Sequence, residues 1–293
     1  MIKLNRRFNQ MIYTLAGLLE DVYAELGQLQ VSTATGGTTT SLIDTKMSGG
    51  GSDRDWEEGT LLILDADGGA PEGEFAAIAA YQDNTGTFTL AAALSAAPEA
   101  EDCYGLVSAV YPVGVMLRLI NHGLRTLGDI PLTDDAALTV FSGQSEYPVE
   151  ASWKRRPPYR VDIQVNDDET GARWERIYDW EFIPTAPGEY GRIAFRQSLP
   201  DGRALRVWYM GPHTAVKFYN DPIAEVIAPS LAVAACVEQA LRWQNSRLSG
   251  GDSFLLQRWN DAKRTLEHAR LLHPIWRPKR GSQMRTAGIG GRG

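Results

Sequence analysis

The sequence predicts an α+β protein: an elongated bundle of about four helices with two inserted antiparallel β modules and an extended C-terminal arm. Segments with apolar residues at helical spacing flank two long regions of short strands divided by turn residues, and the last segment has no periodicity. The expected boundaries are a bundle helix at 1–30, a small acidic barrel or sandwich at 31–111, a bundle helix at 112–130, a second β module at 131–215, two helices at 216–274 and a basic arm at 275–293.

Length and composition are those of a globular protein with room for a large core: 293 residues, of which 43% are hydrophobic and 22% charged. The N-terminal residues show no continuous apolar run of a signal peptide, and no run approaches the roughly 20 residues of a membrane span. Two cysteines, Cys103 and Cys236, lie far apart and form no metal-binding spacing. We therefore expect a protein that folds in a reducing cytoplasm.

The first helix is expected at residues 4–26, where apolar residues recur at steps of three and four. Gly27 follows as a C-terminal cap. A helix of about 24 residues would be about 36 Å long, so its single apolar stripe must lie against other helices.

The following β-rich segment carries the acidity of the chain. Residues 38–111 contain 13 acidic and two basic side chains, a net charge of −11, whereas the whole chain carries −7. Short strands are expected at 38–44, 60–64, 75–81, 87–94 and 104–110, with a hairpin turn at 83–86, where Asn and Gly tolerate positive φ.

A second helix begins at Pro112 and ends near Gly128, and a second β region follows. Its candidate strands are 137–141, 159–165, 174–177, 180–183, 192–195 and 204–209, arranged as an antiparallel sandwich. A turn at 200–202 has Pro and Gly at the positions that a hairpin turn requires.

Two helices complete the bundle. The third is expected to begin at Asp221 and Pro222, with Pro229 kinking or restarting it. The fourth is capped by Asp252 or Ser253, and its apolar residues step 4-3-4-3 as in a coiled-coil seam. They are Leu255, Trp259, Ala262, Leu266 and Ala269.

No catalytic, cofactor-binding or metal-binding residue is expected. The four histidines (His122, His213, His268 and His273) have no ligand spacing, and the first is expected to be structural. The acidic residues at 65–68 resemble only the start of a calcium loop, and a turn is the stronger interpretation. The carboxylate pairs Asp134-Asp135 and Asp167-Asp168 are expected to be solvated turn residues.

Two basic stretches leave alternatives open. Residues 153–156 (WKRR) mix an aromatic ring with three cations, as single-strand binders do, but an exposed loop is favoured. The segment after Pro274 is either a disordered, solubilising end or an arm that orders against a partner, anchored by Trp276 and Ile289. Its candidate partner-binding residues are Trp276, Arg277, Lys279, Arg280, Arg285 and Arg292.

Several short motifs resemble structural proteins of tailed bacteriophages. They are GTTTSLID (37–44), DRDWEEG (53–59), DNTGTFTL (83–90), Asp102-Cys103-Tyr104 and PDGRALRVWYMG (200–211). This pattern resembles the head-to-tail connector, or neck, proteins in which a small β module is inserted.

The resemblance implies an adaptor protein without enzymatic activity or cofactor, located in the virion at the junction of neck and tail after assembly in the host cytoplasm. Many copies, usually twelve, would form a ring that binds the portal protein and a tail or further neck protein. The ring would contact passing DNA transiently and no membrane. The acidic module would face either the lumen, where it repels DNA, or the exterior, where it keeps the particle soluble.

A different function remains open from the sequence. The chain would then be a virion decoration, host-binding or glycan-binding protein whose module at 31–111 displays Trp56 and Tyr81. An enzyme that uses the scattered acidic residues is a third hypothesis, which no constellation of residues supports.

Overall fold

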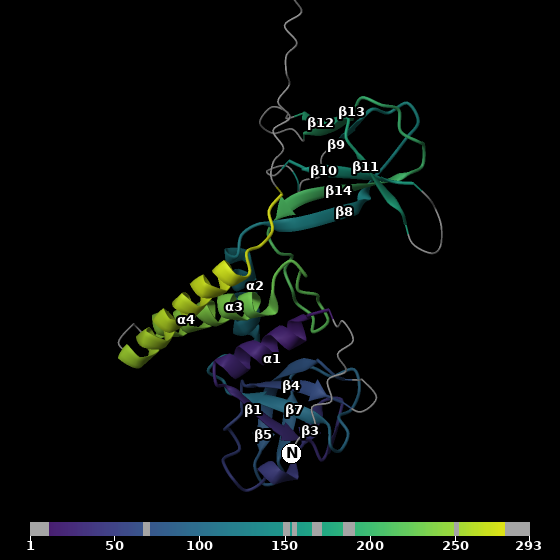
Figure 1. Cartoon of the computed structure of the whole chain (residues 1–293). Coiled ribbons are helices and arrows are strands. Elements are labelled where there is room, and N and C mark those ends of the chain that lie inside the picture. Colours follow the sequence, from purple (N-terminus) through teal and green to yellow (C-terminus); the bar gives the residue numbers. More distant parts are fainter. Residues whose placement is uncertain are drawn as a thin grey trace, which may run out of the picture. The chain divides into compact units, whose positions relative to one another are not determined.

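The computed structural model describes residues 12–66, 71–148, 153, 157–165, 172–183, 191–248 and 252–278. Within these residues it contains four α-helices and three antiparallel sheets of seven, four and three strands (Figure 1). The predicted α+β fold class is confirmed. The chain divides into two compact units, one formed by residues 1–128 and 213–275 and the other by 129–212 and 276–293.

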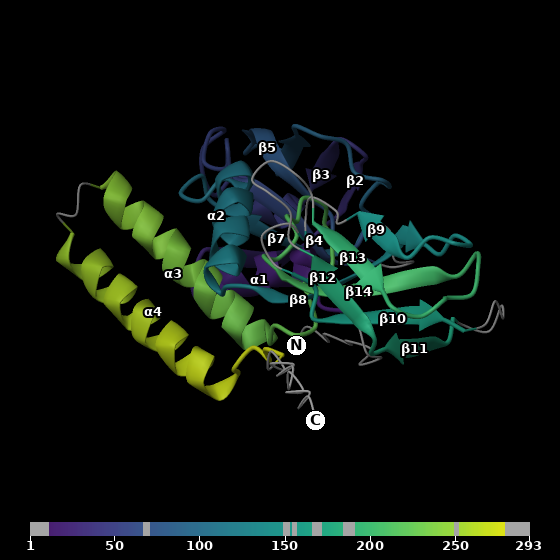
Figure 2. The same ribbon diagram turned by 90° about the horizontal axis from the view of Figure 1, so that it is seen from above.

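The helices all belong to the first unit. They are α1 (Leu15–Glu25), α2 (Val113–Thr126), α3 (Pro229–Arg247) and α4 (Ser253–Leu272). The α3 helix is their common neighbour, because it packs against α1, α2 and α4. Figure 2 shows α3 and α4 side by side as a helical hairpin. Four of the five residues of the predicted α4 seam are buried, namely Leu255, Ala262, Leu266 and Ala269, and Trp259 is half-buried.

The α1 helix begins much later than predicted. Ile12 and Tyr13 are not helical, and Thr14 forms a β-bridge with Pro222. The first turn of α1 is bonded to a distant segment, since Leu15 N donates to Asp221 O over 2.9 Å. This tertiary pairing replaces the helical turn that the apolar spacing predicted; residues 1–11 of the predicted helix lie outside the described residues.

The α3 helix begins at Pro229, where the sequence predicted a kink or a restart, and not at Asp221 and Pro222. The carboxylate of Asp221 accepts hydrogen bonds from Lys217 N and Phe218 N, so it closes a turn before the helix and caps no helix. Ala228 is extended, as a residue before proline prefers, and Pro229 occupies the first helical turn, where its missing N–H costs nothing.

The segment between α1 and α2 forms a single seven-stranded antiparallel sheet, in the order β1-β7-β4-β5-β6-β3-β2. Its strands are β1 (Leu29–Thr33), β2 (Gly36–Thr38), β3 (Ser41–Ile43), β4 (Thr60–Asp65), β5 (Phe75–Gln82), β6 (Thr87–Leu90) and β7 (Cys103–Val107). A short 3₁₀ turn, Thr45–Met47, follows β3. Buried residues of β3 to β7 share one hydrophobic core.

The strand β1 was not predicted, and none of its residues (LQVST) is fully buried. It pairs with β7 from Leu29 opposite Val107 to Thr33 opposite Cys103. The chain therefore enters and leaves this sheet on neighbouring strands, and Ser108 Oγ donates to Gln28 Oε1 over 3.0 Å beside them. The two ends of the segment therefore lie close together.

The second unit contains the predicted antiparallel sandwich. A four-stranded sheet, β11-β10-β14-β8, and a three-stranded sheet, β12-β13-β9, share one core. The strands are β8 (Ile130–Thr139), β9 (Glu146–Pro148), β10 (Arg160–Gln164), β11 (Trp174–Ile177), β12 (Trp180–Ile183), β13 (Arg192–Phe195) and β14 (Ala204–Gly211). Strand β8 is twice as long as predicted and carries a bulge opposite β14, between Leu205 and Val207.

A candidate partner-binding face

Four of the five motifs that carry the phage resemblance meet inside the seven-stranded sheet, whereas the fifth, residues 200–211, lies in the second unit. Asp44, which ends the first motif, is fully buried and accepts a hydrogen bond from Tyr104 Oη over 2.8 Å. Its carboxylate also accepts from Ser32 Oγ over 2.5 Å and from Lys46 N over 2.9 Å. A buried carboxylate is tolerated when its lone pairs are satisfied in this way. Two motif residues 60 positions apart thus form one polar cluster.

The other motifs pack around Phe88 of the DNTGTFTL hairpin. The Phe88 ring stacks on Tyr81 with 4.7 Å between centroids, and Trp56 of the DRDWEEG motif meets it edge-on at 6.5 Å. The turn of the hairpin is bonded to the end of the first motif, since Asp44 N donates to Gly86 O over 2.9 Å. The pattern therefore consists of residues that hold this sheet together.

The packing overturns one expectation for the module. Tyr81 was expected to be displayed to a glycan, but only 3% of it is exposed, and its hydroxyl donates to Met47 O over 2.7 Å. Trp56 is half-buried against the same core. These two rings support the fold of the sheet and do not form an open aromatic platform.

The remaining candidates for chemistry are scattered. His213 is buried, and its Nε2 accepts from Ala224 N over 3.0 Å, whereas its Nδ1 faces Thr214 O. Burial lowers the pKa of His213 below its usual value. His122, His268 and His273 are exposed. Among the described residues, no three side chains of the metal-binding types lie together.

Both thiols are free and buried. Burial raises the pKa of Cys103 and of Cys236, so both thiols stay protonated at neutral pH, and neither is an activated nucleophile. None of the helices in the described ranges has the combination of length and apolar character that a bilayer crossing requires.

A different surface, on the four-stranded sheet of the second unit, gathers charged and aromatic side chains. Val161, Leu205 and Val207 of this sheet point into the core, so their neighbours along β10 and β14 occupy the opposite face. We call this face the arginine–tryptophan face and define it by Arg160, Asp162, Trp174, Arg176, Arg206 and Trp208.

Each arginine of this face lies over an aromatic ring. The Cζ atom of Arg206 is 4.0 Å from the centroid of Trp174, and that of Arg160 is 5.1 Å from the centroid of Trp208. Arg176 lies 5.0 Å over Tyr178, whose side chain is one of the most exposed aromatics of the chain. These cation–π contacts hold the stacked guanidinium groups in place.

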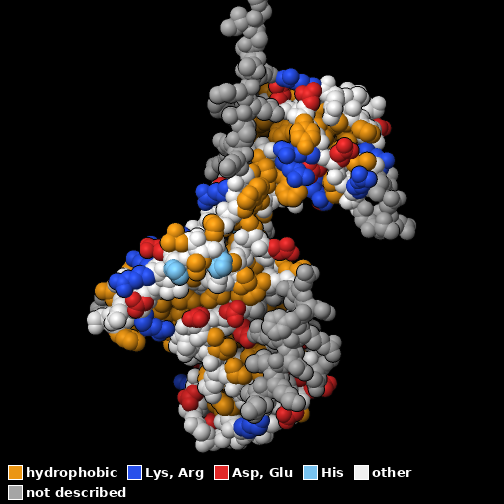
Figure 3. Space-filling model, viewed as in Figure 1, with side chains coloured by type: hydrophobic (Ala, Val, Ile, Leu, Met, Phe, Trp, Pro, Cys, Tyr) orange, Lys and Arg blue, Asp and Glu red, His pale blue; other side chains and the backbone are white. Residues whose placement is uncertain are grey.

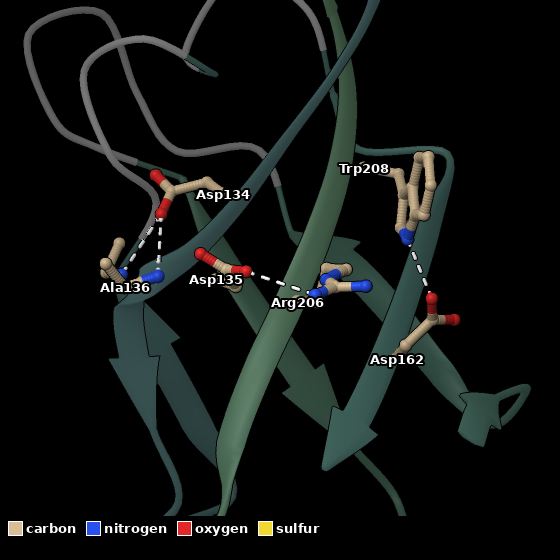
Figure 4. A network of polar contacts seen from close by, with 7 residues as sticks. Asp134, Asp135, Ala136, Asp162, Arg206 and Trp208 are labelled. Atoms are coloured by element: carbon tan, nitrogen blue, oxygen red, sulfur yellow. Dashed lines mark hydrogen bonds and ion pairs between the residues drawn. The ribbon is translucent and has the colours of Figure 1, made fainter. Parts of the chain in front are cut away.

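Asp162 ties two of these side chains together. Its carboxylate accepts from Trp208 Nε1 over 2.7 Å (Figure 4). It also pairs with Arg160 Nε over 2.7 Å, and its own side chain is almost completely buried. Because the carboxylate is satisfied on both oxygens, it fixes the orientation of the ring and of the guanidinium group.

The pair Asp134-Asp135 does not lie in a solvated turn, as was expected. Both residues belong to β8, beside its bulge (Figure 4). Asp134 Oδ1 accepts from the backbone N–H groups of Ala136 and Ala137, and Asp135 pairs with Arg206 over 3.1 Å. The bulge redirects the carboxylate of Asp135 toward the arginine. The pair Asp167-Asp168 lies outside the described residues.

The predicted C-terminal arm is described only at its start. The Trp276 ring is 60% exposed and meets Tyr159 edge-on, with 6.4 Å between centroids. Tyr159 directly precedes β10 and donates its N–H to Trp208 O over 3.0 Å. The first aromatic residue of the basic segment is therefore anchored at the edge of the arginine–tryptophan face. Arg277 is exposed; Lys279, Arg280, Arg285, Ile289 and Arg292 lie outside the described residues.

The WKRR stretch does not offer its aromatic ring to a ligand. Trp153 is completely buried in the core of the sandwich, 6.0 Å from the ring of Tyr209. Residues 154–156 lie outside the described residues.

The sequence reasoning missed the arginine–tryptophan face because it treated β10, β11 and β14 only as core strands. A signal for it was present. Along β14 the outward positions are Arg206 and Trp208, and along β11 they are Trp174 and Arg176. Charged and aromatic residues at every second position of neighbouring strands indicate one decorated sheet face.

A scan against protein-family models finds no match for this chain. A search of curated proteins finds none either.

Proposed function

We propose that this chain is a structural protein of a tailed-phage virion, an adaptor ring between the portal and the tail that forms part of the DNA channel. In this proposal the four helices form one bundle, the two β-rich segments are modules inserted into it, and the basic C-terminal segment is an arm that reaches a partner. No catalytic role belongs to the proposal.

The proposal rests on one observation: residues from four of the motifs pack together in one core. Asp44, Trp56, Phe88 and Tyr104 come from four separate motif segments, and each contacts another motif residue. Residues that must fit one another are a stronger signature of a shared fold than isolated short motifs are. This supports the resemblance to connector proteins on which the function rests.

The arginine–tryptophan face and Trp276 add a surface suited to a protein partner. Arginine and tryptophan are the residues that most often dominate the energy of protein interfaces. Here they are held by cation–π contacts and by the buried carboxylate of Asp162, so binding would order few additional side chains.

Imaging tests the proposal directly. The purified protein, mixed with the portal protein of the same phage, is expected to form a closed ring in electron micrographs, with twelve copies as the expected number. Sedimentation of the same mixture must show a complex. A chain that remains monomeric with the portal present would contradict the proposal.

The arm makes a second, quantitative prediction. Replacing Trp276 and Arg277 by alanine is expected to weaken portal binding by roughly tenfold or more, because interface tryptophans and arginines commonly contribute this much. The matched control replaces Lys217 and Phe218, another exposed cation and aromatic ring, and should leave binding unchanged. Equal binding by both variants, measured by sedimentation or calorimetry, would exclude this role for the arm.

A further inference from the structure

The outer surface of α4 differs from that of an ordinary exposed helix. Its buried seam faces α3, yet large apolar side chains also stand on the opposite side and at both ends. Phe254 is 67% and Leu271 is 80% exposed, and Leu256 and Leu272 are exposed as well. Phe254 and Leu256 lie at the start of α4 and Leu271 and Leu272 at its end, so they flank the charged middle of the helix and do not form one continuous patch.

The same helix carries a positive charge between these apolar ends. It has four basic and two acidic side chains. Lys263 lies 3.8 Å over the ring of Trp259, and Arg264 is 81% exposed, with Asp261 3.5 Å away. Figure 3 shows lysine and arginine side chains beside hydrophobic ones on the helical hairpin.

The opposite charge is concentrated in a loop of the seven-stranded sheet. Residues 52–58 (SDRDWEE) contain four acidic residues, one arginine and Trp56. The backbone of the loop is fixed by its own carboxylates: Asp55 Oδ2 accepts from Ser52 N over 2.8 Å, and Asp53 Oδ1 accepts from Asp83 N over 2.8 Å. Glu57 and Glu58 then remain to face a partner.

Within the described residues, the acidic side chains of this loop form no ion pair with α4. Each copy thus carries an acidic loop and a basic helix surface of opposite charge, and the two do not pair within one copy. Two different surfaces that fit each other are what a head-to-tail contact between identical subunits requires.

We propose that the acidic loop 52–58 of one copy docks on the outer surface of α4 of a second copy. Glu57 and Glu58 face Lys263 and Arg264. The contact rests on the proposed function, because it is the joint by which a ring would close. Opposite charges also steer the copies together, so the association weakens as salt rises.

Zero-length cross-linking tests this contact with the full-length chain alone. Equal amounts of unlabelled and ¹⁵N-labelled protein are treated with a carbodiimide, which joins a carboxylate to a lysine amine as an amide. We expect a peptide that joins Lys263 of one isotopic form to Glu57 or Glu58 of the other, with a yield that falls in 0.5 M salt. Its absence at high protein concentration and low salt would overturn the inference.

Charge reversal makes the test specific. The pair E57K/E58K and the pair K263E/R264E should each lower the yield of cross-linked dimer by roughly tenfold, because like charges then face each other. A one-to-one mixture of the two variants should restore dimers, because each variant keeps one surface that fits the other. A mixture no better than either variant alone would overturn the inference.

Matched reversals at other exposed positions, E225K and R118E, should leave the yield unchanged. An equal loss with these controls would mean that net charge alone drives association, and would overturn the contact. This outcome can be told apart from that of the proposed function. If the chain binds the portal but forms no cross-link, only this contact is contradicted. If the cross-link forms but the chain does not bind the portal, only the adaptor role is contradicted.

Discussion

At the scale of single residues, the structure assigns the polar residues of the motifs to folding. Asp44, which follows β3, joins β1, the 3₁₀ turn and β7 through one carboxylate, which accepts from Ser32, Lys46 and Tyr104. Hydrogen bonds to a charged, buried group contribute more to stability than those between neutral groups.

Replacing Asp44 by asparagine should therefore lower the free energy of unfolding by about 2–4 kcal/mol, because two hydroxyl donors and one N–H lose their charged acceptor. Urea denaturation followed by tyrosine fluorescence measures it. Asp65→Asn removes an exposed carboxylate and should change stability by less than about 0.5 kcal/mol. Combining Asp44→Asn with Tyr104→Phe should cost less than the sum of the two, and strict additivity would show that the pair is not coupled.

The buried histidine gives the protein a pH dependence with a defined sign. Burial lowers the pKa of His213 in the folded state below the value of about 6.5 in the unfolded chain. The unfolded chain therefore binds the proton more readily. The stability that neutral His213 contributes is complete above about pH 6.5 and is lost as the pH falls below it.

His213→Gln should abolish that part of the acid dependence and lower stability at pH 8 by about 1–2 kcal/mol, because the bond to Ala224 N is disturbed. Thermal unfolding between pH 4 and pH 8 provides the measurement. The exposed His268 offers the control, since His268→Gln should leave the slope unchanged. An identical slope for wild type and His213→Gln would refute the assignment.

At the scale of elements, the sequence correctly predicted features that depend on residues close together in the chain. The hairpin turn at 83–86, the cap of α4 by Asp252 and the buried seam of that helix were all predicted from sequence and are confirmed. These features depend on residues within a few positions of one another, where Gly, Asp and apolar spacing act directly.

The hairpin provides a test at this scale. Gly86 has φ of 61°, and a Cβ atom there would lie 2.0 Å from Asp44 O. Gly86→Ala should therefore cost more than about 2 kcal/mol, whereas Gly49→Ala, at φ of 73° with open space, should cost only about 1 kcal/mol. Equal losses in denaturant unfolding would show that the close contact with Asp44 is unimportant.

The sequence predictions were wrong where the structure depends on pairing between segments that lie far apart in the chain. The first turn of α1 is bonded to residues 219–221, and β1 exists only because β7 offers it a partner. Likewise, the pair Asp134-Asp135 was placed in a turn because the bulge opposite β14 cannot be read from either strand alone. The arginine–tryptophan face was missed for the same reason, since its residues meet only once three strands are in register.

At the scale of the whole molecule, two separate segments of the chain form the first unit. Residues 12–128 supply α1, the seven-stranded sheet and α2, and residues 213–275 return to add α3 and α4. The helices α1 and α2 both pack on α3 and not primarily on each other. The helical part should therefore retain its fold when the sheet is removed.

Joining Gln28 to Ser108 through two glycines tests this. The two side chains are already bonded over 3.0 Å, so a short linker should close the chain without strain. The variant is expected to be a monomer that keeps the circular dichroism signal of its helices and unfolds cooperatively on heating. A deletion extended through Tyr111 is the control and should not fold, because it removes a buried ring and the carbonyl bonded to Tyr23. Aggregation of the first variant would show that the sheet is needed for folding.

The pairing of β1 with β7 also decides how the first unit would respond to tension. Leu29 and Val107 are opposite each other, so a force that separates α1 from α2 would act at one end of this strand pair. The hydrogen bonds between the two strands would then break one after another from that end. They would not resist the force together, as they do when two strands are pulled along their length in opposite directions. The bond between Gln28 and Ser108 would be the first to open, and β7 would remain attached to β4. The mechanically weakest joint of this unit is thus the single strand β1, and the core of the sheet would be loaded last.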